Sequence, residues 1–178
     1  MRVCIASSRW AEVGKRCWDW ADAQLPATGP YTLTHDAESS DVFISVLYAH
    51  LVSEEFIAKR RCFNFHPGIL PQYRGAGAFS WAIINGDRQC GVTLHELDVN
   101  IDSGPIIAVE RFPIEAWDTA GSLFAKGMDA IYGLFQLYFP RLLSGDYVKE
   151  PQDESKARIY YRRDLERQRD LTRYVRAF

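Results

Sequence analysis

The chain has 178 residues, of which 47% are hydrophobic and 25% are charged, and its formal net charge is -2 at pH 7. This length allows one well-buried domain and is short for two. A nucleic-acid binder usually presents a basic surface, so the balance of charge disfavours that class. Only a short apolar run follows Arg2, and no stretch approaches the ~20 apolar residues of a membrane span. We therefore expect a cytoplasmic protein without a membrane partner.

Cysteine and histidine spacing gives no sign of a metal site. Neither residue type shows the short paired spacing of zinc ligands, and no C-x-x-C pair is present. The residues are Cys4, Cys17, Cys62, Cys90, His35, His50, His66 and His95. We expect reduced cysteines in the core and no bound metal.

Strand and helix patterns alternate along the chain. Apolar runs predict strands over residues 2–6, 31–34, 41–47, 62–65, 91–97 and 106–112. Apolar positions three and four residues apart predict a helix from Trp10 to about Leu25. Ser53 is suited to cap a short helix over 53–60, and Gly86 to end another over 78–85. Strands separated by helices predict an α/β fold with a Rossmann-like, mostly parallel sheet flanked by helices.

A long helix and a basic tail complete the chain. Asp118 or Thr119 can cap a helix that runs to about Leu143, is interrupted near Pro140 and ends at Gly145. We expect residues 1–150 to form the main domain and residues 151–178 a basic tail that packs on it. The tail's apolar face comprises Tyr161, Leu165, Leu171 or Tyr174, Val175 and Phe178, which predicts a docked amphipathic helix. Contact of its basic face with RNA is the alternative.

Three polar residues are placed where a catalytic site would form. Asn64 and His66 lie two residues apart at the end of a predicted strand, which the following Pro-Gly pair terminates, so their side chains share one face. In an open parallel sheet this end of the strands is where ligands bind. Asp102 lies in a loop before the strand over 106–112, where its carboxylate can face an imidazole.

The three residue types suit formyl transfer to an amine. The reaction passes through a tetrahedral intermediate with a negatively charged oxygen. Asn64 supplies an uncharged N–H donor, His66 titrates near neutrality, and Asp102 can fix the histidine tautomer. A turn cap, a loop histidine and an Asx turn are the structural alternatives for each residue taken alone.

Longer motifs give the chain a family resemblance. NFHPGILPQYRG, WAIINGD and GVTLHELDVNIDSGPII resemble the core of the formyltransferases that use 10-formyltetrahydrofolate. That family includes glycinamide ribonucleotide transformylase, methionyl-tRNA formyltransferase and the sugar N-formyltransferases. The resemblance implies a formyltransferase core over residues 1–150, with Asn64, His66 and Asp102 as its catalytic triad.

The resemblance also implies a folate site. Family members hold the pterin ring in the loop that here comprises Leu47, Tyr48, Ala49, His50, Leu51 and Val52. We expect this loop and the loop from Leu97 and Asp98 to Asp102 to form opposite walls, with apolar side chains on the ring faces and backbone groups at its edge. His95 precedes Asp102 by seven residues, a spacing also found in glycinamide ribonucleotide transformylase, where that histidine lies near the folate. A strand residue facing solvent is the alternative for His95.

Tyr73 and Arg74 are candidates for contacting the other substrate. An arginine fork suits phosphate oxygens, so Arg74 is a candidate phosphate ligand. The alternative is a structural arginine that ties its loop to backbone carbonyls.

Two features distinguish among family members. Ser7-Ser8-Arg9-Trp10 replaces the glycine-rich phosphate loop of glycinamide ribonucleotide transformylase. We also expect no tRNA-binding domain after the core, and PQDESKARIYYRRDLERQRDL resembles the segment that closes the core of sugar N-formyltransferases. We therefore expect formyl transfer from 10-formyltetrahydrofolate to the primary amine of a nucleotide-linked sugar, with dTDP-4-amino-4,6-dideoxyglucose as the favoured acceptor. The purine and tRNA enzymes and a non-catalytic folate or nucleotide binder are the alternatives, and the oligomeric state stays open.

Overall fold

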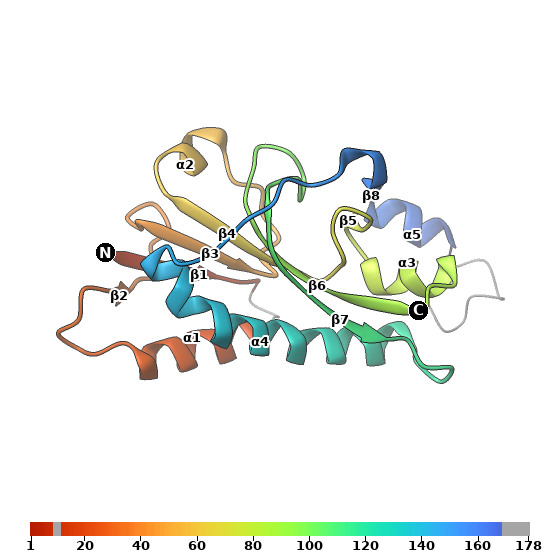
Figure 1. Ribbon diagram of the computed structural model, residues 1–178, viewed down its shortest axis with the longest axis horizontal. Helices are drawn as coiled ribbons and strands as arrows, with labels where there is room; N and C mark the ends of the chain where they lie inside the picture. Colours follow the sequence, from red (N-terminus) through yellow and green to blue (C-terminus); the bar gives the residue numbers. More distant parts are fainter. Residues whose placement is uncertain (9–11, 169–178) are drawn as a thin grey trace.

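A computed structural model of the protein describes residues 1–8 and 12–168. Six strands form the main sheet in the order β2-β1-β3-β4-β6-β7 (Figure 1). Their bounds are β1 Arg2–Ala6, β2 Thr32–Leu33, β3 Val42–Val46, β4 Arg61–His66, β6 Gln89–Glu96 and β7 Ile106–Pro113. The first four are parallel, and β6 pairs antiparallel with both β4 and β7. The predicted α/β fold with a mostly parallel sheet is confirmed.

Helices cover both faces of this sheet. Figure 1 shows α1 (Glu12–Gln24) and α4 (Ala120–Ser144) side by side below it, and α2 (Glu54–Ala58) on the other side. The helix α3 (Ala78–Asn85) packs against α4 and β6. A small parallel sheet joins β5 (Arg74–Gly75) to β8 (Ile159–Tyr160), next to the short helices η1 (Glu154–Lys156) and α5 (Arg162–Gln168).

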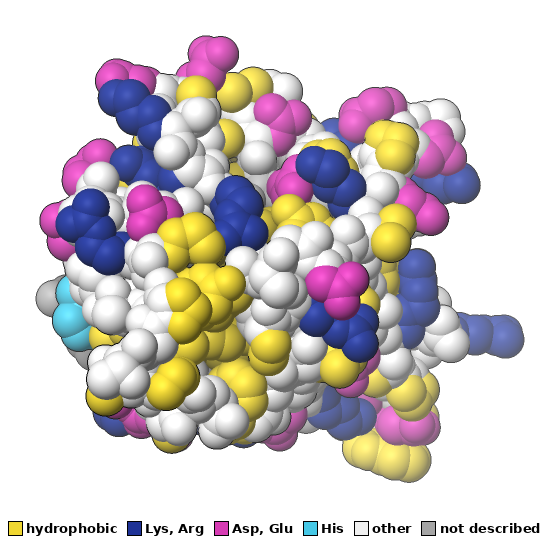
Figure 2. All heavy atoms as spheres, turned by 60° about the vertical axis from the view of Figure 1, so that its left-hand side comes forward, with side chains coloured by type: hydrophobic (Ala, Val, Ile, Leu, Met, Phe, Trp, Pro, Cys, Tyr) yellow, Lys and Arg dark blue, Asp and Glu magenta, His cyan; other side chains and the backbone are white. Residues whose placement is uncertain are grey.

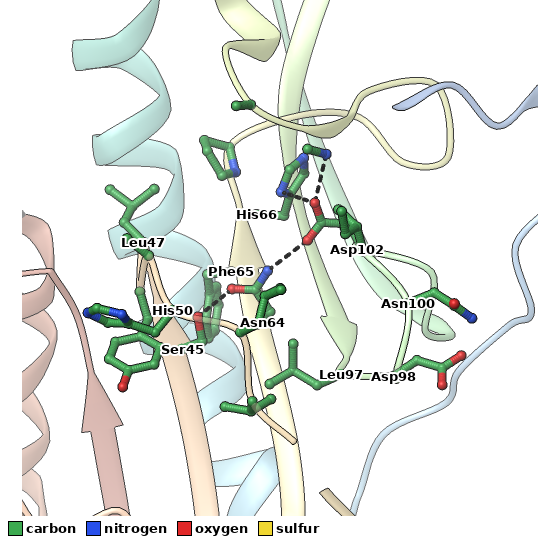
Figure 3. Close-up of a pocket in the computed structure, with 18 of the residues that line it drawn as sticks. Ser45, Leu47, His50, Asn64, Phe65, His66, Leu97, Asp98, Asn100 and Asp102 are labelled. Carbon is green, nitrogen blue, oxygen red and sulfur yellow. Dashed lines mark hydrogen bonds and ion pairs between the residues drawn. The ribbon is translucent and has the colours of Figure 1, made fainter. Parts of the chain in front are cut away.

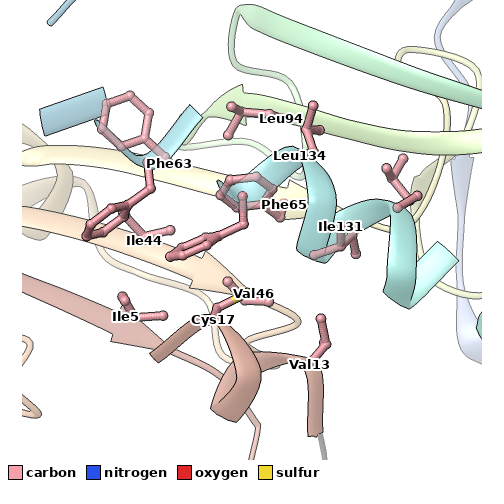
Figure 4. Close-up of a cluster of buried hydrophobic side chains, with 14 of the residues drawn as sticks. Ile5, Val13, Cys17, Ile44, Val46, Phe63, Phe65, Leu94, Ile131 and Leu134 are labelled. Atoms are coloured by element: carbon pink, nitrogen blue, oxygen red, sulfur yellow. The ribbon is translucent and has the colours of Figure 1, made fainter. Parts of the chain in front are cut away.

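Alternation along β4 separates the core from the polar face of the sheet. Phe63 and Phe65 are fully buried and belong to the main apolar cluster, together with Ile131 of α4 (Figure 4). Successive side chains of a strand point to opposite faces, so Asn64 and His66 lie on the other face, where Cys62 packs in a second, smaller cluster. Burial of the two phenylalanines therefore fixes the side on which the polar pair projects.

The helix ends follow the capping residues. Ser53 caps α2 by accepting a hydrogen bond from the Phe56 amide, and Thr119 caps α4 in a capping box with Ser122. Gly86 and Gly145 end α3 and α4 with φ of 73° and 81°, which glycine adopts without strain. These predictions are confirmed.

The prediction of a break at Pro140 is wrong. The helix α4 continues through Pro140 to Ser144. Proline removes one backbone donor and crowds the preceding turn. Phe139, Leu142 and Leu143 on either side are buried in the core, and this packing holds the helix together across the proline.

All four cysteines are buried and unpaired, as expected for reduced core cysteines.

The space-filling view in Figure 2 shows charged side chains of both signs interspersed over one face of the molecule, with apolar side chains gathered near its middle. Within the described residues, no helix is long and apolar enough to cross a membrane.

Only the first part of the predicted tail, to residue 168, lies within the described residues. Leu165 packs against the main core, whereas Tyr161 is 42% exposed. Leu171, Tyr174, Val175 and Phe178 lie outside the described residues. Docking of the whole tail stays a prediction.

The contact between α3 and α4 depends on a glycine in α4. A Cβ added to Gly127 would lie 2.3 Å from the tip of the buried Phe79 ring, whereas one added to Gly133 would meet nothing within 4 Å. We expect Gly133→Ala to raise the free energy of unfolding by roughly 0.5–1 kcal/mol through helix propensity. Gly127→Ala should lower it by about 1–2 kcal/mol, because overpacking outweighs the same gain. Urea denaturation of both variants measures the difference, and equal stabilisation by both would contradict the close packing.

Candidate active site

A cavity of about 490 Å³ opens at the carboxyl ends of β3 and β4. Figure 3 shows Leu47 and His50 on one side of it and Leu97, Asp98 and Asp102 on the other. All six residues from Leu47 to Val52 line it, as do Leu97 and Asp98. The structure thus places the two predicted loops on opposite sides of one cavity.

Neighbouring strands fix the orientation of Asn64. In the sheet register, Asn64 of β4 lies between Ser45 of β3 and His95 of β6. The Ser45 hydroxyl donates to Asn64 Oδ1 at 2.7 Å, and Asn64 Nδ2 lies 3.1 Å from His95 Nε2 and 3.3 Å from Asp102 Oδ1. A reversed amide would set its oxygen against the carboxylate. The side-chain N–H groups of Asn64 therefore face Asp102.

His95 is not a solvent-facing strand residue, so that alternative is wrong. Its side chain is fully buried, because β6 is an inner strand of the sheet. Its Nδ1 lies 2.7 Å from the Glu96 carbonyl oxygen, a contact in which only a protonated nitrogen can donate. Its Nε2 is then an acceptor for Asn64. His95 lies behind Asn64 and does not itself line the cavity.

His66 is held between two acceptors. Its Nε2 lies 2.7 Å from the Tyr73 carbonyl oxygen, and its Nδ1 lies 3.4 Å from Asp102 Oδ2. The shorter contact assigns the proton of the neutral ring to Nε2. That tautomer leaves Nδ1 free to take a proton beside a carboxylate. Gly68 makes room for the ring, since a Cβ there would lie 2.8 Å from Nε2.

Asp102 occupies the turn between β6 and β7. Its φ is 48°, a conformation that non-glycine residues seldom adopt. Oδ2 accepts a hydrogen bond from the Gly75 amide at 2.8 Å, and Oδ1 accepts one from Asn64. The structure therefore brings Asn64, His66 and Asp102 together, although Asp102 comes from a turn distant in sequence.

Burial and charge act in opposite directions in this group. Burial lowers the pKa of His66, and the attraction of Asp102 only partly offsets that effect, so the ring is neutral at neutral pH. Burial alone would raise the pKa of Asp102. At the low pH where a carboxyl group titrates, the attraction of protonated His66, together with His95 and the Gly75 amide, outweighs burial and holds that pKa well below its usual range. The site therefore pairs a carboxylate with a neutral imidazole.

Tyr73 and Arg74 point away from this cavity. The Tyr73 hydroxyl donates to Asp87, and its ring stacks on that of Tyr160 at 5.4 Å between centroids. Arg74 is buried and forms a two-bonded ion pair with Glu154 at 2.6 and 3.0 Å. These contacts favour the structural alternative for Arg74, with a side-chain carboxylate in place of the expected backbone carbonyls.

The motifs do not indicate three other groups of the site. Ser45 precedes any motif, the Gly75 contribution is a backbone amide, and Gln152 comes from a segment distant in sequence. Gln152 Nε2 donates to the carbonyls of Asp102 and Gly104 at 2.8 and 2.7 Å. Gly75 lies within QYRG and Gln152 within PQDE, two segments that carry the family resemblance, but that resemblance assigns neither residue a contact with Asp102.

The cavity suits an organic ligand. Leu47, Val52, Leu97 and Ile101 provide apolar surface, and Asn64, His66 and Asp102 provide polar groups. No grouping of histidine, cysteine or acidic side chains suited to a metal ion occurs within residues 1–8 and 12–168.

Comparison with known proteins identifies the family. Residues 31–135, more than half of the chain, match the family model described as formyl transferase. The chain belongs to the formyl transferase family. The matched region includes the whole Asn64, His66 and Asp102 group and both loops of the cavity.

Solved structures share the fold. An N-formyltransferase from Helicobacter canadensis, in complex with folinic acid and dTDP-3-aminofucose, aligns with a TM-score of 0.81 and 23% identity over 91% of this chain and 71% of its own. A formyltransferase from Anoxybacillus kamchatkensis, in complex with UDP-4,6-dideoxy-4-formamido-L-AltNAc and tetrahydrofolate, aligns with a TM-score of 0.77 and 20% identity over 99% and 94%. A 4-N formyltransferase from Francisella tularensis aligns with a TM-score of 0.78 and 19% identity over 99% and 87%.

The lowered pKa of His66 predicts a loss of stability in mild acid. In the unfolded chain a histidine binds its proton near pH ~6.5, whereas the buried ring binds it only at lower pH. Protonation therefore favours the unfolded chain as the pH falls below about 6.5. Asp102 adds nothing in this range, because it is ionised in both states. We expect the free energy of unfolding to fall between about pH 7 and about pH 5.5 more steeply than in His66→Gln, as measured by urea denaturation. Equal slopes would contradict a buried neutral His66.

Proposed function

We propose that the protein transfers a formyl group from 10-formyltetrahydrofolate to the primary amine of a nucleotide-linked amino sugar. The observation that carries the proposal is the convergence of Asn64, His66 and Asp102 at the floor of one cavity in a formyl transferase family member. A donor, a neutral base and an orienting carboxylate are the groups that this reaction requires.

We place the folate in the cavity between the two loops. Its flat pterin ring would contact the apolar side chains of Leu47, Val52 and Leu97 and hydrogen-bond to loop backbone. This position directs the formyl group of N10 toward Asn64 and His66. The folate derivatives in the Helicobacter and Anoxybacillus enzymes support this choice of donor.

The proposed reaction begins with attack of the neutral amine on the formyl carbon. The carbonyl oxygen then becomes an oxyanion, for which an N–H of Asn64 is the donor. The 3.3 Å bond to Asp102 is the longer of the two contacts of Asn64 Nδ2 and the one that the oxyanion would replace. When the bond between carbon and N10 breaks, the carbonyl re-forms and the departing nitrogen takes up a proton.

His66 moves the proton in this scheme. Its Nδ1 is unprotonated and lies beside Asp102, so it can accept the proton that the attacking amine loses. The resulting imidazolium would be stabilised by the Asp102 carboxylate at 3.4 Å. Once Nδ1 is protonated, Asp102 orients the ring and takes part in returning the proton to the folate nitrogen.

The choice of acceptor rests on related structures and on the sequence, and not on the geometry of the catalytic group. All three related structures named above are formyltransferases, and two hold nucleotide sugars, one linked to dTDP and one to UDP. The sequence lacks the glycine-rich phosphate loop of the purine enzyme after its first strand. We therefore propose a dTDP-linked 4-amino-4,6-dideoxyhexose, with dTDP-4-amino-4,6-dideoxyglucose as the first acceptor to try.

The triad is tested by single substitutions. Loss of an oxyanion donor typically lowers turnover ~100- to 1000-fold, and loss of a general base or its partner ~100- to 10,000-fold. We expect Asn64→Ala, His66→Ala and Asp102→Ala each to lose at least ~100-fold in kcat while remaining folded by circular dichroism. Asp22→Ala on the exposed side of α1 is the matched control and should turn over normally. A triad variant with the activity of that control would have no part in the mechanism.

The acceptor is tested by mass spectrometry. Purified protein with 10-formyltetrahydrofolate should add one formyl group to dTDP-4-amino-4,6-dideoxyglucose. Two matched acceptors serve as comparisons. A dTDP-3-amino sugar changes only the position of the amine, and a UDP-4-amino sugar changes only the nucleotide, so the two show which feature the enzyme selects. Formylation of glycinamide ribonucleotide or methionyl-tRNA with all amino sugars untouched would refute the sugar assignment. Folate binding without turnover of any acceptor would instead favour a non-catalytic binder.

A further inference from the structure

We propose that Gln152 is a positioning residue that holds the turn carrying Asp102 in place for catalysis. The inference rests on the proposed function, because it assigns Asp102 a catalytic part. Gln152 lies in the strap from Glu150 to Tyr160, which follows α4. Figure 1 shows this segment crossing from the end of α4 to β8 on the opposite side of the molecule.

The turn needs such support because little of its own backbone is paired. Asp102 has a φ of 48°, and its carbonyl and that of Gly104 accept hydrogen bonds from Gln152 Nε2 at 2.8 and 2.7 Å. A partly buried carbonyl without a donor costs about 1–3 kcal/mol. The one amide group of Gln152 therefore satisfies two backbone carbonyls of the turn that carries the catalytic carboxylate.

The amide of Gln152 is itself held. Its Oε1 accepts two hydrogen bonds from Arg74, from Nε at 3.1 Å and from Nη2 at 2.8 Å. Arg74 is 5% exposed, and two of its other N–H groups form the ion pair with Glu154. Because the guanidinium can only donate, it determines which end of the Gln152 amide faces the turn. The nitrogen of Gln152 must then point at Asp102 and Gly104.

The two residues of β5, Arg74 and Gly75, both support Asp102. Arg74 fixes the turn backbone through Gln152, and the next residue, Gly75, donates its amide to Asp102 Oδ2 at 2.8 Å. Backbone pairing holds the strap at both ends, through Glu150 with Ile106 and through Tyr160 with Gly75. The strap and β5 thus act as one support for the carboxylate that faces His66.

The decisive variant is Gln152→Met, which keeps the length of the side chain and removes its hydrogen bonds. A misplacement of catalytic groups by about 1 Å can lower turnover ~100-fold. We expect kcat with 10-formyltetrahydrofolate and dTDP-4-amino-4,6-dideoxyglucose to fall ~10- to 100-fold, with KM for each substrate within about threefold. Glu150→Gln is the matched control on the same strap and should keep normal kinetics, because only its backbone pairs with β7.

A second variant separates the two halves of the amide. Gln152→Glu keeps an acceptor for Arg74 and loses both donors to the turn. We expect it to fold at least as well as Gln152→Met and to show the same loss of kcat. Normal kcat in folded Gln152→Glu would overturn the proposal even where Gln152→Met fails to fold.

A double variant tests whether Gln152 acts through Asp102. Once Asp102→Asn has removed the carboxylate, Gln152→Met should cost no further turnover. Independent, multiplying losses would overturn the proposal. Near-normal turnover of Gln152→Met beside an inactive Asp102→Asn would also overturn it.

Histidine NMR provides a test that needs no substrate. The attraction of Asp102 raises the pKa of His66, so a displaced carboxylate should lower the midpoint of the His66 ring titration in Gln152→Met relative to the parent. An unchanged midpoint would overturn the proposal. If Asp102→Asn turned over normally, the proposed role of Asp102 would fail, and this titration would still decide whether Gln152 positions the carboxylate.

Discussion

The site depends on one ionised carboxylate held in a partly buried turn. Only 14% of the Asp102 side chain is exposed, so its charge must be stabilised by protein groups. Gly75 and Asn64 donate to it, and His66 lies against its second oxygen. Asn64 and His66 come from β4 and Gly75 comes from β5, so the carboxylate has these partners only when β4, β5 and the turn between β6 and β7 meet at one point. The fold around the cavity is the means by which these groups meet.

That meeting point follows from a change of direction within the sheet. The first four strands are parallel, and the carboxyl ends of two of them, β3 and β4, provide the floor of the cavity. The strand β6 then runs antiparallel to β4, which places His95 directly opposite Asn64, and the turn that follows β6 brings Asp102 to Asn64 and His66. The antiparallel pairing therefore supplies both the second imidazole and the carboxylate.

The buried histidines have different tasks because their hydrogen bonds differ. His95 Nδ1 is occupied by a neighbouring carbonyl, which leaves Nε2 to fix the amide of Asn64. His66 Nε2 is occupied by the Tyr73 carbonyl, which leaves Nδ1 beside Asp102 and open to a proton. Burial favours the neutral form of His66, and a nearby carboxylate prepares the site for the charged form. In the proposed reaction His66 gains and then loses a proton, and this balance would favour both steps.

The sequence by itself determined the elements, the family and the residues at the ends of the strands. Apolar periodicity and capping residues act locally, so Ser53, Thr119 and Gly145 marked helix ends that the structure confirms. The motif around Asn64 and His66 identified the family for the same reason, since it is one continuous segment. Tertiary structure alone decided the burial of His95, the continuity of α4 through Pro140 and the pairing of Arg74 with Gln152 and Glu154. Each of these depends on strand register or on packing between residues far apart in the chain, and no local pattern encodes which distant group will satisfy a buried donor or acceptor.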